Sequence, residues 1–524
     1  MRGKFTLMLL SFVLMSCSKD WTKIEQNLDY SYGRQLSHGK IVLGDRLENP
    51  YTTSNITKAL SSLYPTKADR IDVKPTNLYV RFLPYDQQQY ERLVELGLTL
   101  TDHPLDYDIA VEGDWYHDPE IPEGEPTWQY AVVPHDFEFP RMAYQIIDEC
   151  YIAENDPATR ADGIDWEAVE RQAYILTGNE QMLTESMTKA TGKLQPSGRI
   201  TIEDKDFNEG KPFGVAGVRV SCNTFVKFSQ CYTDRDGYYQ MDRYFSAEPR
   251  YRLVFKNESG FSIGFNLVLV PASVSTLGKA GPEGINMTVT EDSDEKLFRR
   301  CVVNNAAYEY ISRCNIDDLG INPPPAGLCF WIFNSLDAGS ALMLKHGAIL
   351  GNDLVKSYLG NYASLIKYFL PDITIGTKSS KTYRDIYMDT CHELSHASHF
   401  SKVGTAYWDT YIRYVIESYV RSGGNLYGDG SGDGAGHCEV GEMWAYYLES
   451  KLYKHRYGGS LPALGTGWWF YPQIFRFLDE RGLAQDDIFS VLDENVDSRD
   501  DLKNALLLSN PDSRTMIEQV FSRY

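Results

Sequence analysis

The chain has 524 residues, of which 43% are hydrophobic and 13% aromatic, enough apolar surface for globular folding. It is longer than one hydrophobic core usually organises, so we expect a multidomain α+β protein with about three domains. The formal net charge is −21, from 51 basic and 72 acidic residues, and no stretch forms a basic stripe. This balance argues against a nucleic-acid partner and indicates a well-hydrated, soluble surface.

The first residues are expected to direct export. Arg2 and Lys4 precede an apolar run from Phe5 to Met15 that is too short to span a membrane as a helix. The run ends in Leu-Met-Ser-Cys without an Ala-x-Ala cleavage site, which resembles a bacterial lipobox. This resemblance implies cleavage before Cys17, which would become the lipidated N-terminal residue. An ordinary secretory signal with an incidental cysteine is the alternative.

In either case we expect an extracytoplasmic protein. Residues 18–20 resemble the export signal of surface lipoproteins in Bacteroides-like bacteria, which favours anchoring in the outer membrane. No later apolar run is long enough for a transmembrane helix, so the lipid on Cys17 would be the only membrane anchor.

The other cysteines do not indicate a disulfide scaffold. Eight of the nine follow Cys17, which is few for a chain of this length. Cys222 and Cys231 could bridge neighbouring strands, whereas Cys391 and Cys438 are expected to be small buried residues. No two cysteines have the Cys-x-x-Cys spacing, so a thiolate zinc site is not expected.

The region from 18 to 190 is expected to be a mixed α+β region whose role is open, with partner binding or inhibition as options. Residues 77–82 have the composition of a strand, and residues 86–96 and 164–177 have the apolar spacing of helices. Its histidines are scattered among prolines and aromatic residues, and we expect them to be structural; they are His103, His117 and His135.

Residues 195–275 are expected to form a small β-sandwich. Short alternating segments are separated by glycines and by an Asp-Gly turn at residues 236–237. Gly-Val-Arg-Val at 217–220 and Thr-Asp-Arg-Asp-Gly-Tyr at 233–238 resemble the carboxypeptidase regulatory-like domain, an accessory module without catalytic residues. Residues 234–237 lack a later bidentate glutamate, so a hairpin turn is expected there rather than a calcium loop.

A metal-binding pattern lies at residues 392–396, which read His-Glu-Leu-Ser-His. This is the His-Glu-x-x-His core of many zinc metallopeptidases. On a helix, His392 and His396 are one turn apart on one face, so both imidazoles can reach one metal ion. Glu393 would be placed to take a proton from a metal-bound water. The flanking residues favour a buried helix over 383–400, and a solvated surface helix is the alternative.

The third ligand must come from elsewhere, because catalytic zinc generally takes three protein ligands. His399 would lie about 10 Å beyond His392 along the helix axis, which is too far, so we expect it to be structural or to line the cleft. The segment from His437 to Glu449 has helical spacing, with Glu439, Glu442 and Tyr446 on one side.

These features resemble the gluzincin type of zinc peptidase, over about residues 285–524. A glutamate on a second helix followed by alanine at plus three matches its Glu-x-x-Ala form, which implies Glu442 as the ligand, with Ala445 as the alanine. Glu439 is the alternative, as a ligand or as an acceptor that orients a histidine. A solvated acidic face is the third interpretation.

The resemblance also implies a strand, expected at 372–376, whose edge lines the cleft and pairs with an extended peptide. A helix is expected at 294–314. A donor for the oxyanion is required as well, and His437, Tyr446 and Tyr427 are candidates, with His437 or Tyr446 preferred.

The sequence therefore predicts an exported, lipid-anchored metallopeptidase that uses Zn2+ and Glu393 to hydrolyse a peptide or protein substrate. One alternative is a catalytically inactive surface binding protein on the same scaffold, and another is a zinc hydrolase of a non-peptide substrate. The expected segments are a signal at 1–17, the mixed region at 18–190, the sandwich at 195–275 and a mainly helical catalytic domain with a short sheet at 285–524.

Overall fold

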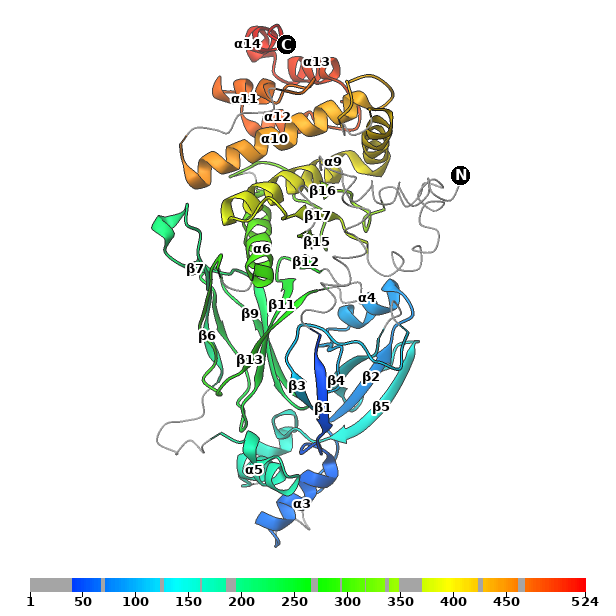
Figure 1. The fold of residues 1–524 in the computed structure, drawn as a ribbon, viewed down its shortest axis with the longest axis vertical. Helices are drawn as coiled ribbons and strands as arrows, with labels where there is room; N and C mark the ends of the chain where they lie inside the picture. The colour runs from blue at the N-terminus through cyan, green and yellow to red at the C-terminus, as the bar shows by residue number, and fades with distance from the viewer. Residues whose placement is uncertain are drawn as a thin grey trace.

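The computed structural model describes residues 40–66, 71–122, 127–160, 163–184, 195–264, 272–292, 295–315, 317–334, 339–347, 370–422, 427–459 and 467–524. Every structural statement below refers to these residues, and Cys17 lies outside them. The described chain combines several β-sheets with α-helices, in agreement with the expected α+β class. Figure 1 shows the C-terminal helices at one end of the long axis, the sheets in the middle and two short N-terminal helices at the other end.

The N-terminal region contains two small antiparallel sheets, one pairing β1 with β3 and one with the order β4-β2-β5. The expected strand and both expected helices are confirmed as β2, α4 and α5. Asp86 caps α4 because its side chain accepts a hydrogen bond from the Gln89 amide. The elements are β1 (Val42–Arg46), α3 (Thr53–Leu63), β2 (Asn77–Leu83), α4 (Gln87–Glu95), β3 (Tyr107–Val111), β4 (Gln129–Pro134), β5 (Ala143–Cys150) and α5 (Trp166–Leu176).

Two further sheets follow, and one of them continues into the region of the metal-binding pattern. The smaller has the order β10-β6-β14, with β7 on β6, and the larger has the order β16-β17-β15-β12-β11-β8-β9, with β13 on β11. Their strands are β6 (Ser197–Ile202), β7 (Phe213–Gly214), β8 (Val218–Thr224), β9 (Lys227–Tyr232), β10 (Tyr238–Gln240), β11 (Arg250–Asn257), β12 (Ser262–Ile263), β13 (Val274–Lys279), β14 (Met287–Val289), β15 (Cys329–Phe333), β16 (Ser340–Ala341) and β17 (Ile373–Gly376).

Strand β12 makes the connection, because it pairs antiparallel with β11 and parallel with β15. The larger sheet therefore runs from strands of residues 195–275, the region expected to be the sandwich and called the sandwich below, to β17, which precedes the metal-binding pattern. One hydrophobic core contains Val220 and Leu253 of the sandwich together with Leu394 and Trp444 of the C-terminal helices. The two regions are thus packed as one body through a shared core and a shared sheet.

Two expectations for residues 195–275 are only partly met. The Asp234 carboxylate accepts hydrogen bonds from the amides of Asp236 and Tyr238, so a turn is present at 234–238. The turn does not join a hairpin, because β9 pairs with β8 and β10 pairs with β6 of the other sheet. None of the eight described cysteines forms a disulfide. Cys231 lies opposite Val220 rather than Cys222 across the β8–β9 pair, so the suggested bridge between the two cysteines is wrong.

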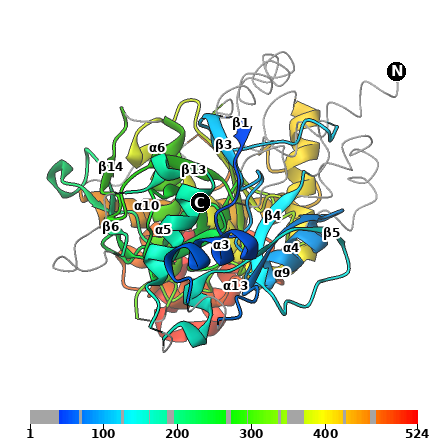
Figure 2. The same ribbon diagram turned by 90° about the horizontal axis from the view of Figure 1, so that it is seen from below.

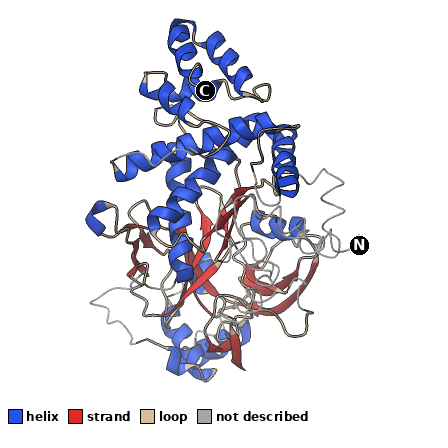
Figure 3. Cartoon of the chain, turned by 45° about the horizontal axis from the view of Figure 1, so that its top comes forward, coloured by secondary structure: helices blue, strands red, loops and turns tan. Residues whose placement is uncertain are grey.

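The C-terminal helices cover one end of the larger sheet (Figures 1 and 3). The helix expected at 294–314 is confirmed as α6, and the metal-binding helix begins at Tyr383 as expected but continues past Phe400. The helices are α6 (Glu295–Arg313), α9 (Tyr383–Ser422), α10 (Ala435–Tyr457), α11 (Gln473–Glu480), α12 (Gln485–Ser490), α13 (Arg499–Ser509) and α14 (Arg514–Phe521).

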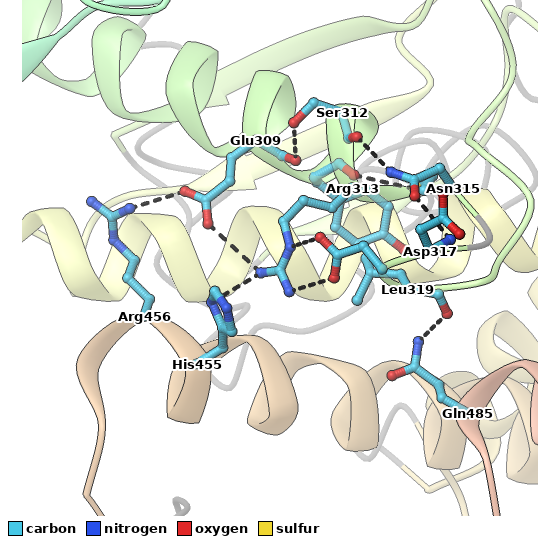
Figure 4. Close-up of polar contacts among 12 residues, drawn as sticks. Glu309, Ser312, Arg313, Asn315, Asp317, Leu319, His455, Arg456 and Gln485 are labelled. Carbon is cyan, nitrogen blue, oxygen red and sulfur yellow. Dashed lines mark hydrogen bonds and ion pairs between the residues drawn. The ribbon is translucent and has the colours of Figure 1, made fainter.

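A buried arginine near the end of α10 joins four parts of the chain. Arg456 donates to Glu309 of α6 at 2.9 Å and to Asp204, which follows β6, at 3.3 Å. Its guanidinium also lies 4.8 Å from the ring centroid of Tyr387 on α9. Figure 4 shows Arg456 and Arg313 on either side of Glu309, with His455 next to Arg313. These contacts fix α10 relative to α9.

Helix α9 is bent at Gly404, which has φ 77° and ψ −178°. The His396 and Tyr411 rings stack with their centroids 5.9 Å apart. A straight helix would separate these two residues by about 22 Å along its axis. The second half of α9 therefore folds back over the first half, and Gly404 makes this turn possible because its φ and ψ are nearly restricted to glycine.

We predict that Gly404→Ala lowers the free energy of unfolding by about 1–3 kcal/mol, since alanine is strained in this backbone conformation. No atom lies within 4 Å of the position that its Cβ would take, so the cost comes from the backbone alone. Urea unfolding measures the change. The matched control is Gly441→Ala, within α10, which should be neutral or stabilising by about 0.5–1 kcal/mol. Equal effects of the two substitutions would contradict this explanation.

Candidate metal centre

The first two donors of the centre come from one turn of α9. Thr382 caps the helix, since its side chain accepts from the Asp385 amide at 3.2 Å. His392 and His396 are buried on the same face, and their Nε2 atoms lie 3.2 Å apart. The spacing of four residues therefore directs both nitrogens to one point, as the sequence predicted.

The third donor comes from α10. Glu442 places Oε2 at 3.7 Å from His392 Nε2 and Oε1 at 3.6 Å from His396 Nε2. Its side chain is only 2% exposed, which rules out a solvated acidic face. Within the described residues, Oε2 is buried without a hydrogen-bond partner. A buried carboxylate oxygen without a partner is costly, and a bound cation would satisfy it.

The distances between donors suit a single metal ion. Two ligand atoms about 2.1 Å from a tetrahedral ion are about 3.4 Å from each other. The three separations, 3.2, 3.6 and 3.7 Å, lie close to this value. His392, His396 and Glu442 form the group of donors that could hold a metal ion in the described chain. Two imidazoles and one carboxylate suit more than one transition metal, so the donors alone do not identify it.

Two neighbouring groups orient these donors. Glu449, two turns after Glu442 on α10, accepts from His392 Nδ1 at 3.0 Å, which leaves Nε2 as the metal-facing nitrogen. Tyr411, beyond the bend in α9, donates its hydroxyl to Glu442 Oε1 at 2.5 Å. Helical spacing from Glu442 could have revealed Glu449. Tyr411 could not have been found, because a continuous helix would place it far from the cluster.

Burial and close charges give the two histidines opposite pKa shifts. Burial lowers the pKa of His392, but its contacts with Glu442 and Glu449 outweigh this and raise it well above the ordinary value. Burial lowers the pKa of His396, and attraction to Glu442 offsets only part of that effect. Burial opposes ionisation of Glu442, yet the two histidines hold its pKa well below the ordinary range. Without a metal, one proton therefore resides on His392 beside an ionised Glu442.

Glu393 lies next to the donors and against the end of the sheet. A Cβ at Gly339, just before β16, would lie 2.9 Å from Glu393 Oε1 and 2.7 Å from the Thr374 carbonyl oxygen. Burial raises the pKa of Glu393 to about 8, with further contributions from Glu442, Asp389 and Glu449. Gly339 thus provides the space in which this carboxylate sits, a role that only the folded chain reveals.

The structure separates the other candidates from the cluster. Glu439 is buried and lies against Arg499 of α13, whose Nε is 3.6 Å from Glu439 Oε1, and it does not belong to the group of donors around the histidines. This placement rules out Glu439 as a neighbour of the histidines and favours Glu442. His399 is fully buried against Tyr407 and Trp408, so its packing fits the structural role that the sequence allowed.

The two preferred oxyanion donors occupy different positions. His437, in the first turn of α10, packs against Tyr407 with the ring centroids 4.3 Å apart. Tyr446 packs against His392 at 4.4 Å and places its hydroxyl 3.2 Å from that of Tyr427. The geometry therefore brings Tyr446 and Tyr427 to the metal centre, whereas His437 contacts the bend in α9.

The sequence indicated the segment at 372–376 as the edge strand beside the site, but the edge strand among the described residues is β16. The expected strand is present as β17, but β16 pairs antiparallel with it through Ser340 and Ala341. The expectation that β17 offers its edge to the cleft is therefore wrong. Two residues of β16, too few to be recognised from a pattern, form the outermost described strand.

A comparison with protein-family models finds no match to this chain, and a comparison with curated proteins finds none either. Among the described helices, none has the length and apolar character needed to cross a membrane.

We predict that Glu442→Ala lowers the affinity for a divalent transition metal by about a hundredfold or more, because it removes one of three ligands. Competition with a chromophoric chelator measures the affinity. The matched control is Glu439→Ala, one turn earlier on the same helix, which should leave the affinity unchanged. A loss in the Glu439 variant alone would overturn the ligand assignment.

We also predict that metal affinity increases with pH. His392 has a raised pKa and carries a proton in the metal-free protein, and an imidazole must lose this proton before it binds a metal. Affinity should therefore fall as pH decreases, by up to about tenfold per pH unit for one displaced proton. Calorimetry in two buffers of different ionisation enthalpy would detect the released proton. Affinity that does not vary between about pH 6 and pH 8 would contradict this protonation state.

Proposed function

We propose that the protein is a zinc metallopeptidase of the gluzincin type that hydrolyses peptide bonds outside the cytoplasm. The observation that supports this most is the position of Glu393, a buried carboxylate between the metal donors and the end of the sheet. A site that only stored a metal would not require an additional carboxylate, such as that of Glu393, beside the three metal donors. The proposal includes lipid anchoring at Cys17, which lies outside the described residues, and an accessory role for the sandwich.

His392, His396 and Glu442 would hold the zinc ion. Their donor types are those of catalytic zinc sites with two histidines and one glutamate. A bound zinc ion supplies Lewis acidity, which lowers the pKa of water and polarises a carbonyl group. We prefer zinc to iron because hydrolysis needs no change of oxidation state and Glu393 provides the base that hydrolysis requires.

Glu393 would act as the general base and then as the general acid. Its pKa of about 8 applies to the protein without a metal. A nearby dication favours the carboxylate form, so Glu393 would be able to accept a proton at neutral pH. It would take this proton from the attacking water and pass it to the leaving amine nitrogen.

Tyr446 is the preferred donor to the oxyanion that develops during hydrolysis. Its ring lies against the first histidine, and Tyr427 is within hydrogen-bond distance of its hydroxyl. A hydroxyl held next to the reacting carbonyl stabilises the negative charge of the transition state. His437 is less suitable because its ring packs on Tyr407.

A peptide is the substrate class that the sheet favours. Strand β16 is the outermost described strand of the larger sheet, and it begins directly after Gly339, where a Cβ would lie 2.9 Å from Glu393 Oε1. An extended peptide can add to such an edge through backbone hydrogen bonds. This arrangement would place a peptide bond near the base and would not depend on particular side chains.

The decisive variant is Glu393→Gln, which keeps the size of the side chain and removes its basicity. It should bind zinc as the native protein does and lower the rate of peptide cleavage by about a hundredfold to ten-thousandfold. Mass spectrometry of peptide mixtures after incubation, with zinc analysis of the same samples, tests both parts.

Cleavage by the variant at the native rate would remove Glu393 from the mechanism. Zinc binding without cleavage by the native protein would instead favour the alternative of an inactive binding protein on the same scaffold. Cleavage that survives removal of the metal would exclude a metallopeptidase.

A further inference from the structure

A cavity lies between the N-terminal region and the sandwich, far from the metal centre. Its empty volume, mouth included, is about 490 Å3, and both regions line it. Figures 1 and 2 show β1 and β3 of the N-terminal region beside β13 of the larger sheet. Strand β11 begins in the cavity at Arg250 and ends at Asn257, which contacts Asn304 of α6. The cavity is thus at the end of β11 that points away from α6 and α9.

Arg252 is the distinctive residue of this cavity, because it is a buried cation without an ion-pair partner among the described residues. It is 5% exposed, and no carboxylate among the described residues lies within ion-pair distance of it. Its Nη1 donates to Asn223 Oδ1 at 2.8 Å, and its Nη2 lies 3.2 Å from His103 Nε2. A guanidinium has about five N–H donors, so these two acceptors leave others for a ligand.

The neighbouring histidine does not supply the missing charge. His103 Nδ1 lies 2.8 Å from Asp102 Oδ1, which orients the ring so that Nε2 can accept from Arg252. Burial lowers the pKa of His103, so this ring is neutral at neutral pH. The nearest negative charge, on Asp102, is therefore separated from Arg252 by an imidazole.

Two more cations lie at the same cavity. Arg250 precedes Arg252 by two residues on β11, so both side chains are on one face of the sheet. Lys279 of β13 is directly opposite Arg250. Arg250 pairs with Glu112, whereas Lys279 is exposed. Burial and the charge of Arg250 lower the pKa of Arg252 to about 10, so it stays cationic at neutral pH. Glu112 compensates Arg250, so Arg252 and Lys279 are the cations of this lining that an anionic ligand could compensate.

The rest of the lining limits the type of anion. Asp108 and Glu248 also line the cavity and would repel a dianion such as phosphate. They could accept hydrogen bonds from an N–H group of a ligand instead. Leu105, Ile109 and Phe225 give the lining an apolar part. A ligand that fits all three parts has one carboxylate, one N–H group and an apolar body.

We propose that this cavity binds a small organic carboxylate with an N–H group and an apolar body, through Arg252 and Lys279. A free amino acid and the C-terminal residue of a peptide share this chemistry. Arg252 would hold the carboxylate with its planar guanidinium, which matches the geometry of two carboxylate oxygens. This binding site does not depend on the proposed peptidase activity.

Calorimetry of the full chain with three probes tests the proposal. N-acetyl-L-leucine represents a peptide C-terminus, L-leucine represents a free amino acid, and N-acetyl-L-leucinamide lacks the carboxylate. At least one acid should bind with a stoichiometry of about one, and the amide should bind about tenfold more weakly or not at all. Tighter binding of N-acetyl-L-leucine would indicate a peptide C-terminus as the ligand, and tighter binding of L-leucine would indicate a free amino acid. Metal-free native protein serves as the background, because Glu442 then fills the position between the two histidines and no metal ion is present to bind a carboxylate.

Substitutions locate the binding. Arg252→Gln should weaken binding of the acid by about tenfold or more. Because a buried arginine can be needed for folding, Lys279→Gln provides a second test on an exposed residue and should weaken binding by about threefold. Its matched control is Lys211→Gln, an exposed lysine outside the cavity, which should have no effect.

Equal binding of the acid and the amide, no binding of either acid, or tighter binding of inorganic phosphate would overturn the proposal. The same holds if folded Arg252→Gln binds like the native protein, or if Lys279→Gln and Lys211→Gln behave alike.

Discussion

The structure of the candidate site depends on the burial of one carboxylate between two imidazoles. Glu442 is almost completely shielded from water, and His392 and His396 lie 3.7 and 3.6 Å from its carboxylate oxygens. Removing a carboxylate from water is expensive unless close partners compensate it. The two imidazoles compensate it in part, and one of its oxygens still has no hydrogen-bond partner among the described residues. A divalent cation at the same point would satisfy all three side chains together.

This constraint explains several features that lie outside the cluster. Helices α9 and α10 must keep a fixed register, and Arg456 links α10 to α6, to α9 and to the sandwich through Glu309, Tyr387 and Asp204. The bend at Gly404 brings Tyr411 back to Glu442. The shared sheet and core hold the sandwich against these helices, so the sandwich contributes to the rigidity of the site.

Much of the site could be predicted from the sequence because it depends on local spacing. The four-residue step between His392 and His396 and the helical segment containing Glu442 are visible without a structure. Whether Glu442 or Glu439 lies beside the histidines depends on three-dimensional packing, since α13 brings Arg499 to Glu439. Gly339 could not be identified, because the space that it leaves for Glu393 lies between segments far apart in sequence. The edge strand β16 and the cavity around Arg252 could not be predicted for the same reason, because both bring together segments that are far apart in sequence.

The most direct test of the account is the identity and amount of metal in the full protein as purified, measured by elemental mass spectrometry. X-ray absorption at the edge of that metal would then report its ligands. The account predicts about one zinc per chain, bound by two imidazole nitrogens and a carboxylate oxygen at about 2.0–2.2 Å. Iron at this site, or no bound metal after exposure to zinc at neutral pH, would contradict it.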